Sequence, residues 1–320
     1  MKKFDSLRWE PRWVSHLGCI KGCLNFLNRP ISDAWLYGVT GHAFVLNICG
    51  DLCPSGPTDW DTRMFRQLGK NAGYVLDNVS GWKGNQDLAQ LQEQAWQHVK
   101  NSLDKDLPCY GWELDIPEFF VIYGYDDDGY YISGPGCDNG KGPMLWQRLG
   151  TSEIGVVDVS SVRLTQPPDD RKAVRDALSY ALEHGLEPKK YTDPQCFGGL
   201  QGYDAWIRSV EKGRAAAFGL AYNTAVWTEC RKFAVAFLRE VREQLDDANL
   251  NPYFDKATAL FETVSQNLDS VRQAYPFDPE LTMAPVLLTG RSQSAALALR
   301  RAKDAEAAGF EIFTDIVTQL

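Results

Sequence analysis

Residues 117–135 read PEFFVIYGYDDDGYYISGP. Two runs of aromatic and β-branched residues, Phe119–Tyr123 and Tyr130–Ile132, flank the Gly- and Asp-rich stretch 124–129. This pattern predicts a β-hairpin closed by a polar turn. The acidic residues of the turn lack the alternate spacing and the terminal Glu of a calcium-binding loop, so we interpret them as solvated turn residues.

The rest of the first half predicts mixed helix and strand. Apolar residues recur at helical spacing after Gly18, and the segment 42–48 has strand character. Gly, Pro and Asp mark 51–59 as a loop and 165–170 as a linker. Further helices are predicted at 60–72 and 86–102, and further strands at 74–79 and 154–159.

The second half predicts helices almost throughout. Pro, Gly and Asn residues separate the expected helices, which lie near 170–184, 199–213, 214–245, 252–274 and 291–317. No fixed-period repeat is present, which favours a bundle over a solenoid. We therefore predict an α+β fold, with an α+β domain over 1–165 and a helical bundle over 166–320.

Composition limits the classes of partner. The 320 residues carry a net charge of −9, which disfavours nucleic acid and anionic membranes because both need basic patches. The start, MKKFDSLRWEPRW, has no apolar segment typical of a signal peptide, and no run of about 18 apolar residues occurs. We expect a cytoplasmic protein whose eight cysteines are thiols.

Cys19 and His42 are the first candidates for chemistry. Cys19 follows Gly18 at the expected start of a helix, where the positive end of the helix dipole favours the reactive thiolate. His42 follows Gly41 and leads an expected strand, a position from which a general base can meet a helix-borne thiol. The alternative is that the cysteine is a small core residue and the histidine a half-buried polar residue.

Cysteine spacing permits a second chemistry. Cys19 and Cys23 are four residues apart, as are Cys49 and Cys53, and zinc sites use cysteine pairs of similar spacing. The first pair is expected in a helix, so a zinc site would need ligands from a helix, a strand and a loop. We therefore predict no metal and no cofactor.

Three stretches resemble papain-like, bacteriocin-processing cysteine peptidases, nearest the branch of the butirosin-biosynthesis acyltransferase. They are HLGCIKGCLNFL at 16–27, YGVTGHAFVL at 37–46 and the hairpin stretch 117–135. The segment GLQGYDAWIRSVEKG at 199–213 is similar to the helical C-terminal domain of the same branch. The resemblance implies a papain-like domain followed by an all-helical domain.

Two triad positions of that family are altered. Glu118 stands where the peptidases have their catalytic His, and Gly134 stands where they have an Asp before Pro. Three hypotheses remain: Glu118 orients His42 beside Cys19, Glu118 is itself an acid or base with a raised pKa, or the domain has lost catalysis and kept its cleft.

The leading prediction is cysteine-dependent acyl transfer, by an amide or thioester hydrolase or an acyltransferase. Its expected catalytic residues are Cys19, His42 and Glu118, with the helix N-terminus as the oxyanion site. The expected cleft-lining residues are Cys23, Thr40, Gly41 and Tyr123. The expected partners are a small-molecule or acyl-carrier-bound substrate and, in a homodimer, a second copy of the chain. The alternative is a catalytically inert papain-like domain that binds a small molecule or a partner protein.

Overall fold

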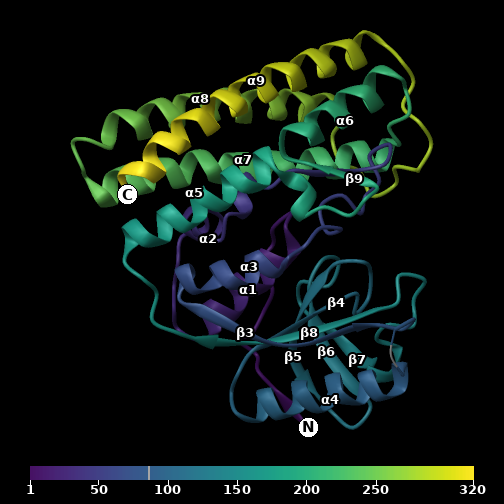
Figure 1. Ribbon diagram of the computed structural model, residues 1–320. Helices are drawn as coiled ribbons and strands as arrows, with labels where there is room; N and C mark the ends of the chain where they lie inside the picture. Colours follow the sequence, from purple (N-terminus) through teal and green to yellow (C-terminus); the bar gives the residue numbers. More distant parts are fainter. Residues whose placement is uncertain (86) are drawn as a thin grey trace. The chain divides into compact units, whose positions relative to one another are not determined.

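A computed structural model describes residues 1–85 and 87–320 and divides the chain into two compact units (Figure 1). The sheet unit comprises Met1–Ser32 and Gly73–Gln166, and the helical unit comprises Asp33–Ala72 and Pro167–Leu320. The division near 165 that the sequence predicted therefore holds at the linker but not for residues 33–72. Helix α2 (Asp33–Val39) and the 3₁₀ turn His42–Phe44 pack on a helix of the second half, because their apolar side chains are buried there.

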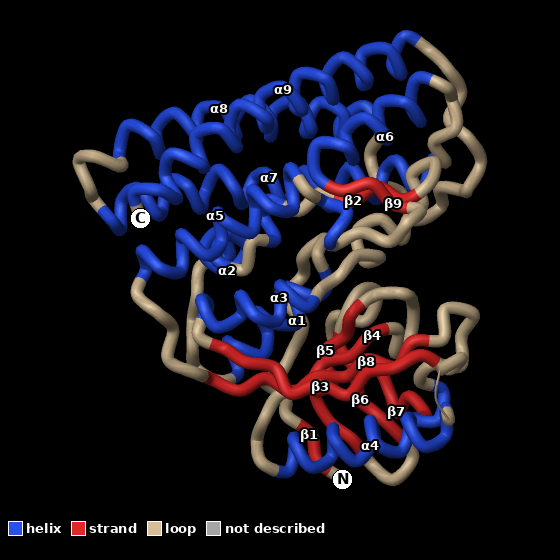
Figure 2. Tube along the Cα trace, in the orientation of Figure 1, coloured by secondary structure: helices blue, strands red, loops and turns tan. Residues whose placement is uncertain are grey.

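The sheet unit is built on an antiparallel sheet (Figure 2). Strand β5 pairs with β4, β6 and β1, and the order along the sheet is β3-β8-β4-β5-β6-β7. The strands are β1 (Lys2–Lys3), β3 (Tyr74–Trp82), β4 (Cys109–Trp112), β5 (Phe119–Tyr125), β6 (Gly129–Ser133), β7 (Lys141–Leu145) and β8 (Val156–Leu164). The unit also contains the helices α1 (Ser15–Phe26) and α4 (Leu88–Asp104).

The hairpin predicted from residues 117–135 is confirmed as β5 and β6. The strands pair antiparallel, with Tyr125 opposite Tyr130. Asp126 holds the turn: its carboxylate accepts the backbone N–H groups of Asp128 and Gly129 at 3.0 and 3.1 Å. The acidic turn is therefore closed by its own hydrogen bonds, as polar hairpin turns commonly are.

Alternating side chains of β5 pack against different helices. Phe120 lies in a buried cluster with Trp96 and Val99 of α4. Phe119, its neighbour along the strand, stacks on His16 of α1, with ring centroids 4.2 Å apart. Successive residues of a strand point to opposite faces of the sheet, so α1 and α4 cover opposite faces.

The helical unit has a core of packed aromatic rings. Phe44 makes edge-to-face contacts with Phe261 and Phe313, at centroid distances of 5.4 and 5.1 Å. The helices are α2, α3 (Arg63–Leu68), α5 (Asp170–Leu186), α6 (Gly199–Glu211), α7 (Ala217–Leu245), α8 (Asn251–Ala274) and α9 (Gly290–Gln319). The predicted helices of the second half are thus confirmed, and an α+β fold is shown.

The strand expected over residues 42–48 is wrong for its first part. Residues His42–Phe44 form a 3₁₀ turn, and strand β2 comprises only Asn47–Cys49. It pairs antiparallel with β9 (Cys196–Gly198), which places Cys49 directly opposite Cys196. Gly41, at φ 75°, directly precedes the 3₁₀ turn in a left-handed conformation that glycine adopts without strain. His42 therefore does not lead a strand.

Among the residues that the structure describes, no helix has the length and apolar character needed to cross a membrane.

Candidate functional site

Cys19 lies inside helix α1 rather than at its start. The helix begins at Ser15, so Cys19 is one turn further along, and its side chain is fully buried. Burial raises the pKa of the Cys19 thiol well above its ordinary value, and the nearby Cys23 and Glu118 raise it further. The expected position of Cys19 at the helix start is therefore wrong, and desolvation of the thiolate opposes the effect of the helix dipole on this thiol.

Ser15 occupies the helix start that the sequence assigned to Cys19. Its hydroxyl donates a hydrogen bond to Oε2 of Glu118. Oγ of Ser15 in turn accepts the backbone N–H of Phe119 at 3.1 Å. Glu118 directly precedes β5, so the sheet presents its carboxylate to the first residue of α1. The pair joins a hydroxyl and a carboxylate at the positive end of a helix dipole.

Four side chains with rings pack at the start of α1. The indole Nε1 of Trp9 donates to the carbonyl oxygen of Ser15 at 3.2 Å. His16, the next residue of α1, stacks on Phe119, and its Nε2 hydrogen-bonds the hydroxyl of Tyr110 at 2.9 Å. Both His16 and Tyr110 are almost fully buried. These contacts hold the start of α1 against β4 and β5.

His42 belongs to the helical unit, whereas Cys19 and Glu118 belong to the sheet unit. Its Nδ1 hydrogen-bonds Sγ of Cys230 at 3.7 Å, and its ring meets that of Trp60 edge-on. Burial lowers the pKa of His42 to about 3, so the ring is neutral at pH 7. The predicted triad of Cys19, His42 and Glu118 is thus divided between the two units, and His42 has a local structural environment of its own.

The predicted cleft-lining residues are divided in the same way. Cys23 is buried in the sheet unit, where burial and the nearby Cys109 raise the pKa of its thiol. Tyr123 lies on β5, with the guanidinium of Arg8 4.1 Å from its ring centre.

Thr40 and Gly41 belong to the helical unit. The hydroxyl of Thr40 is buried and donates to the carbonyl oxygen of Leu36 at 2.7 Å. A Cβ added at Gly41 would lie 2.4 Å from the ring of Tyr180. Both residues are accounted for by helix termination and close packing.

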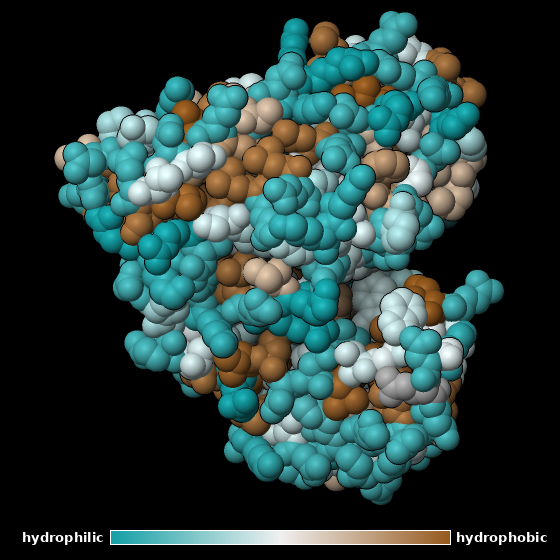
Figure 3. Space-filling model, viewed as in Figure 1, coloured by the Kyte–Doolittle hydropathy of each residue, from teal (hydrophilic) through white to brown (hydrophobic). Residues whose placement is uncertain are grey.

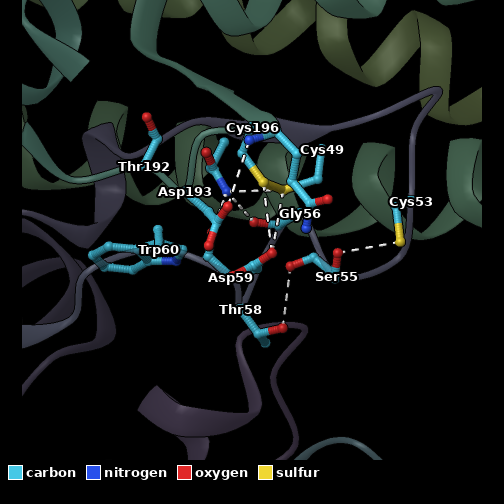
Figure 4. Close-up of a disulfide and its surroundings, with 12 residues drawn as sticks. Cys49, Cys53, Ser55, Gly56, Thr58, Asp59, Trp60, Thr192, Asp193 and Cys196 are labelled. Atoms are coloured by element: carbon cyan, nitrogen blue, oxygen red, sulfur yellow. Dashed lines mark hydrogen bonds between the residues drawn. A yellow bond between two sulfur atoms is a disulfide. The ribbon is translucent and has the colours of Figure 1, made fainter. Parts of the chain in front are cut away.

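A second cluster lies at the paired strands β2 and β9, and the sequence reasoning did not identify it (Figure 4). A disulfide joins Cys49 and Cys196, which are 147 residues apart in the chain. The expectation that all eight cysteines are thiols is therefore wrong for this pair. Strand pairing, which the spacing of the cysteines does not reveal, brings the two sulfur atoms together.

Asp59 completes this cluster. Its Oδ2 lies 3.9 Å from Sγ of Cys49 and 3.6 Å from Sγ of Cys196. Burial, followed by the nearby Asp193, raises the pKa of the Asp59 carboxyl. The Asp59 oxygen and the two sulfur atoms lie within 4.8 Å of one another, but in the disulfide the sulfur atoms are bonded to each other and are not thiolate ligands for a metal. The zinc site considered in the sequence analysis combined Cys49 and Cys53 with Cys19 and Cys23. The structure divides these four cysteines between the two units.

A surface groove of about 620 Å³ lies beside the start of α9. Exposed Leu288 and Leu297 line it, and an ion pair between Glu211 and Arg300 lies at its edge. Figure 3 shows apolar patches among polar residues over the helices on the face that it displays. None of the predicted site residues lines the groove.

The chain matches no family model, and a search of curated proteins finds no match.

Proposed function

We propose that the sheet unit is a hydrolytic or acyl-transferring domain of papain-like type in which the hydroxyl of Ser15 is the nucleophile. The observation that carries the proposal is the hydrogen bond from Ser15 to Glu118 at the start of α1. A hydroxyl nucleophile needs a base within hydrogen-bond reach, and this carboxylate meets that requirement. The class of reaction predicted from the sequence is kept, but the nucleophile moves from Cys19 to Ser15.

The burial of Cys19 supports this reassignment. A thiol is an effective nucleophile as a thiolate, and burial holds Cys19 in the neutral form. A serine hydroxyl instead loses its proton as it attacks, so it needs a positioned base more than a lowered pKa. Glu118 supplies that base to Ser15 directly.

The proposed reaction has two steps. Oγ of Ser15 attacks a carbonyl carbon while its proton passes to the Glu118 carboxylate. The positive end of α1 stabilises the oxyanion. The leaving group departs with the proton from Glu118, which leaves an acyl ester on Ser15. Water or an acceptor hydroxyl or amine then attacks this ester, and Glu118 accepts its proton and returns it to Ser15.

The proposal keeps the substrate class expected from the sequence, a small molecule or an acyl group on a carrier, and a cytoplasmic location. It differs from the alternative of an inert domain that binds a small molecule or a partner. The two proposals make opposite predictions for covalent labelling of Ser15.

Labelling with a fluorophosphonate probe and hydrolysis of p-nitrophenyl acyl esters test the proposal. We expect an adduct on Ser15, its loss in Ser15→Ala, and a rate reduced about 10²- to 10⁴-fold in Glu118→Gln, as for loss of a general base. Cys19→Ala should keep the activity. Absence of an adduct on Ser15 in the wild-type chain would favour the alternative of an inert domain. Activity that depends on Cys19 rather than on Ser15 would show that the Cys19 thiol is the nucleophile.

Ser152 provides a matched control. Its hydroxyl donates to Oε2 of Glu113 at 2.8 Å, so it forms a second serine–glutamate pair in the same unit. This pair lies in a loop and not at a helix start. Ser152→Ala should leave both labelling and turnover unchanged.

A further inference from the structure

The Cys49–Cys196 disulfide lies among polar side chains, and both of its cysteines are buried. Cys196 is 6% exposed, whereas Cys49 is 2% exposed. The disulfide connects β2 to β9, and each strand has three residues. Cys196 is the less buried of the two cysteines, so we assign the attack by an incoming thiolate to its sulfur.

Asp59 directs its carboxyl group at both sulfur atoms (Figure 4). A disulfide sulfur carries no hydrogen, so these contacts are hydrogen bonds only when Asp59 carries the proton or the cysteines are reduced. The charged neighbour Asp193 disfavours the ionised form of Asp59, and Gln195 partly offsets this effect through a hydrogen bond. The cluster thus places a proton carrier beside a bond whose cleavage generates thiolates.

A second polar group contacts Cys49. The side-chain amide of the fully buried Asn47 donates to Sγ of Cys49 at 3.5 Å. The same amide also donates to the carbonyl oxygens of Gly56 and Asp59, at 2.8 and 2.9 Å, which fixes its orientation. A donor held in this position stabilises negative charge on Cys49 more than on Cys196.

We propose that Cys49, Cys196 and Asp59 form a thiol–disulfide exchange site that reacts with an external dithiol. A thiolate of the dithiol attacks Sγ of Cys196, and the electron pair of the broken S–S bond leaves on Cys49. Asp59 gives its proton to Cys49, whose sulfur Asn47 also stabilises. This step leaves a mixed disulfide on Cys196.

The second step completes the exchange. The second thiol of the dithiol passes its proton to the Asp59 carboxylate. It then attacks the first sulfur of the dithiol, which is bonded to Cys196 in the mixed disulfide. The electron pair leaves on Cys196, which takes the proton from Asp59. In total the dithiol is oxidised to its disulfide, and two electrons and two protons pass to the cysteine pair. Asp59 regains its proton from solvent. This chemistry lies in the helical unit and does not depend on Ser15.

Cys53 offers an internal comparison. It is exposed, its sulfur accepts a hydrogen bond from the Ser55 hydroxyl at 3.1 Å, and Figure 4 shows the sulfur pointing away from the disulfide. Cys53→Ser should therefore leave the exchange rate unchanged.

The test uses the native full-length chain with dithiothreitol as the dithiol. Quenching by alkylation followed by peptide mass spectrometry gives the rate of reduction of Cys49–Cys196 across pH. We expect reduction without denaturant, and a rate about a hundredfold lower at pH 7 in Asp59→Asn, the scale of a positioned acid–base group. The inflection of the pH profile assigned to Asp59 should disappear in this variant.

Asp193→Asn separates proton transfer from a structural role. Removal of the Asp193 charge should move the Asp59 inflection to lower pH and leave it present, because the repulsion that raises this pKa is relieved. Resistance of the disulfide to dithiothreitol in the folded chain would overturn the proposal. An unchanged rate and profile in Asp59→Asn, or isolation of both cysteines as thiolates on a stoichiometric zinc ion, would also overturn it.

Discussion

The hydroxyl of Ser15 hydrogen-bonds the carboxylate of Glu118, although 103 residues separate the two in the chain. One residue begins α1 and the other directly precedes β5. The family resemblance points to a nucleophile at a helix start and a base at a strand start. Ser15 is the first residue of α1, and Cys19 lies one turn deeper in the helix.

Reactivity of the thiols should follow exposure and not helix position. We expect iodoacetamide at pH 6 to modify Cys53 first, because it is the exposed free thiol among the described residues. Cys19 should stay unmodified in the folded chain, since burial raises its pKa well above the ordinary value. Peptide mass spectrometry of a time course checks the order, and fast modification of Cys19 would contradict it.

Ser15→Ala should destabilise the sheet unit. The change leaves the Phe119 N–H and the Glu118 carboxylate without the Ser15 oxygen, and loss of one partner of a partly buried hydrogen bond costs about 1–3 kcal/mol. Urea unfolding followed by far-UV circular dichroism measures the change. Ser152→Ala, at the more exposed pair with Glu113, should lower the free energy of unfolding less. Equal effects of the two variants would show that burial does not set the cost of losing the hydrogen bond.

Loss of either partner of the Arg231–Glu306 ion pair should strongly destabilise the helical unit. The two side chains are fully buried, with Nη2 of Arg231 2.6 Å from Oε1 of Glu306, and Tyr203 also donates to this carboxylate. Glu306→Gln should cost about 3–5 kcal/mol, because it leaves a buried guanidinium without its counter-charge.

The exposed pair Arg239–Glu262 is the matched control, and Glu262→Gln should cost less than about 1 kcal/mol. Chemical denaturation measures both variants. A similar cost for the two pairs would show that burial does not set the strength of the interaction.

Reduction of the disulfide should lower the stability of the helical unit. Cys49 and Cys196 close a loop of 147 residues, and loop-closure entropy predicts a loss of up to about 5 kcal/mol on opening it. Thermal unfolding of a Cys49→Ala/Cys196→Ala variant should show a lower midpoint than the oxidised chain. Cys53→Ser should unfold at the wild-type midpoint, and an unchanged midpoint in the double variant would contradict the expectation.

Acid should destabilise the helical unit through its buried histidines. Burial lowers the pKa of His42 to about 3 and that of His184 to about 4, against an ordinary value of 6.5, and the Arg231 charge lowers both further. Between these pH values the unfolded chain binds more protons than the folded chain. The stabilising contribution of the two buried histidines is therefore complete above about pH 6.5 and is lost as the pH falls toward 3.

The expected loss for His42 alone is on the order of a few kcal/mol. His42→Gln should make the fall in unfolding free energy between pH 6 and 4 shallower, whatever its effect at pH 7. Denaturation midpoints measured across this range provide the check. An identical slope in the variant would show that His42 does not carry the acid sensitivity.

Local sequence patterns were sufficient for most secondary-structure elements. The alternation of apolar residues and the Asp- and Gly-rich turn predict the β5–β6 hairpin, and helical spacing together with Pro and Gly breakers predicts the helices of the second half. These signals act over a few residues, so they can be read without knowledge of the tertiary contacts. They also explain why Glu118 is recognisable as a strand-leading carboxylate.

The identity of the residues that meet depended on the tertiary structure. The start of α1 at Ser15 rather than near Cys19, the assignment of 33–72 to the helical unit and the burial of His42 against Cys230 follow from packing between distant segments. Burial reverses the effect of a helix dipole on a thiol, since desolvation of a charge outweighs a half-charge at the helix end.

Sequence alone thus determined the α+β composition, the hairpin and the series of helices, because each depends on local periodicity. Tertiary structure decided which side chains became partners: Ser15 with Glu118, His42 with Cys230, and Cys49 with Cys196 and Asp59. Apart from the contact of Cys49 with Asp59, which are 10 residues apart, these pairings join segments more than a hundred residues apart through strand register and helix packing. No spacing rule in a single sequence encodes these contacts, and they also set the protonation states on which the proposed chemistry depends.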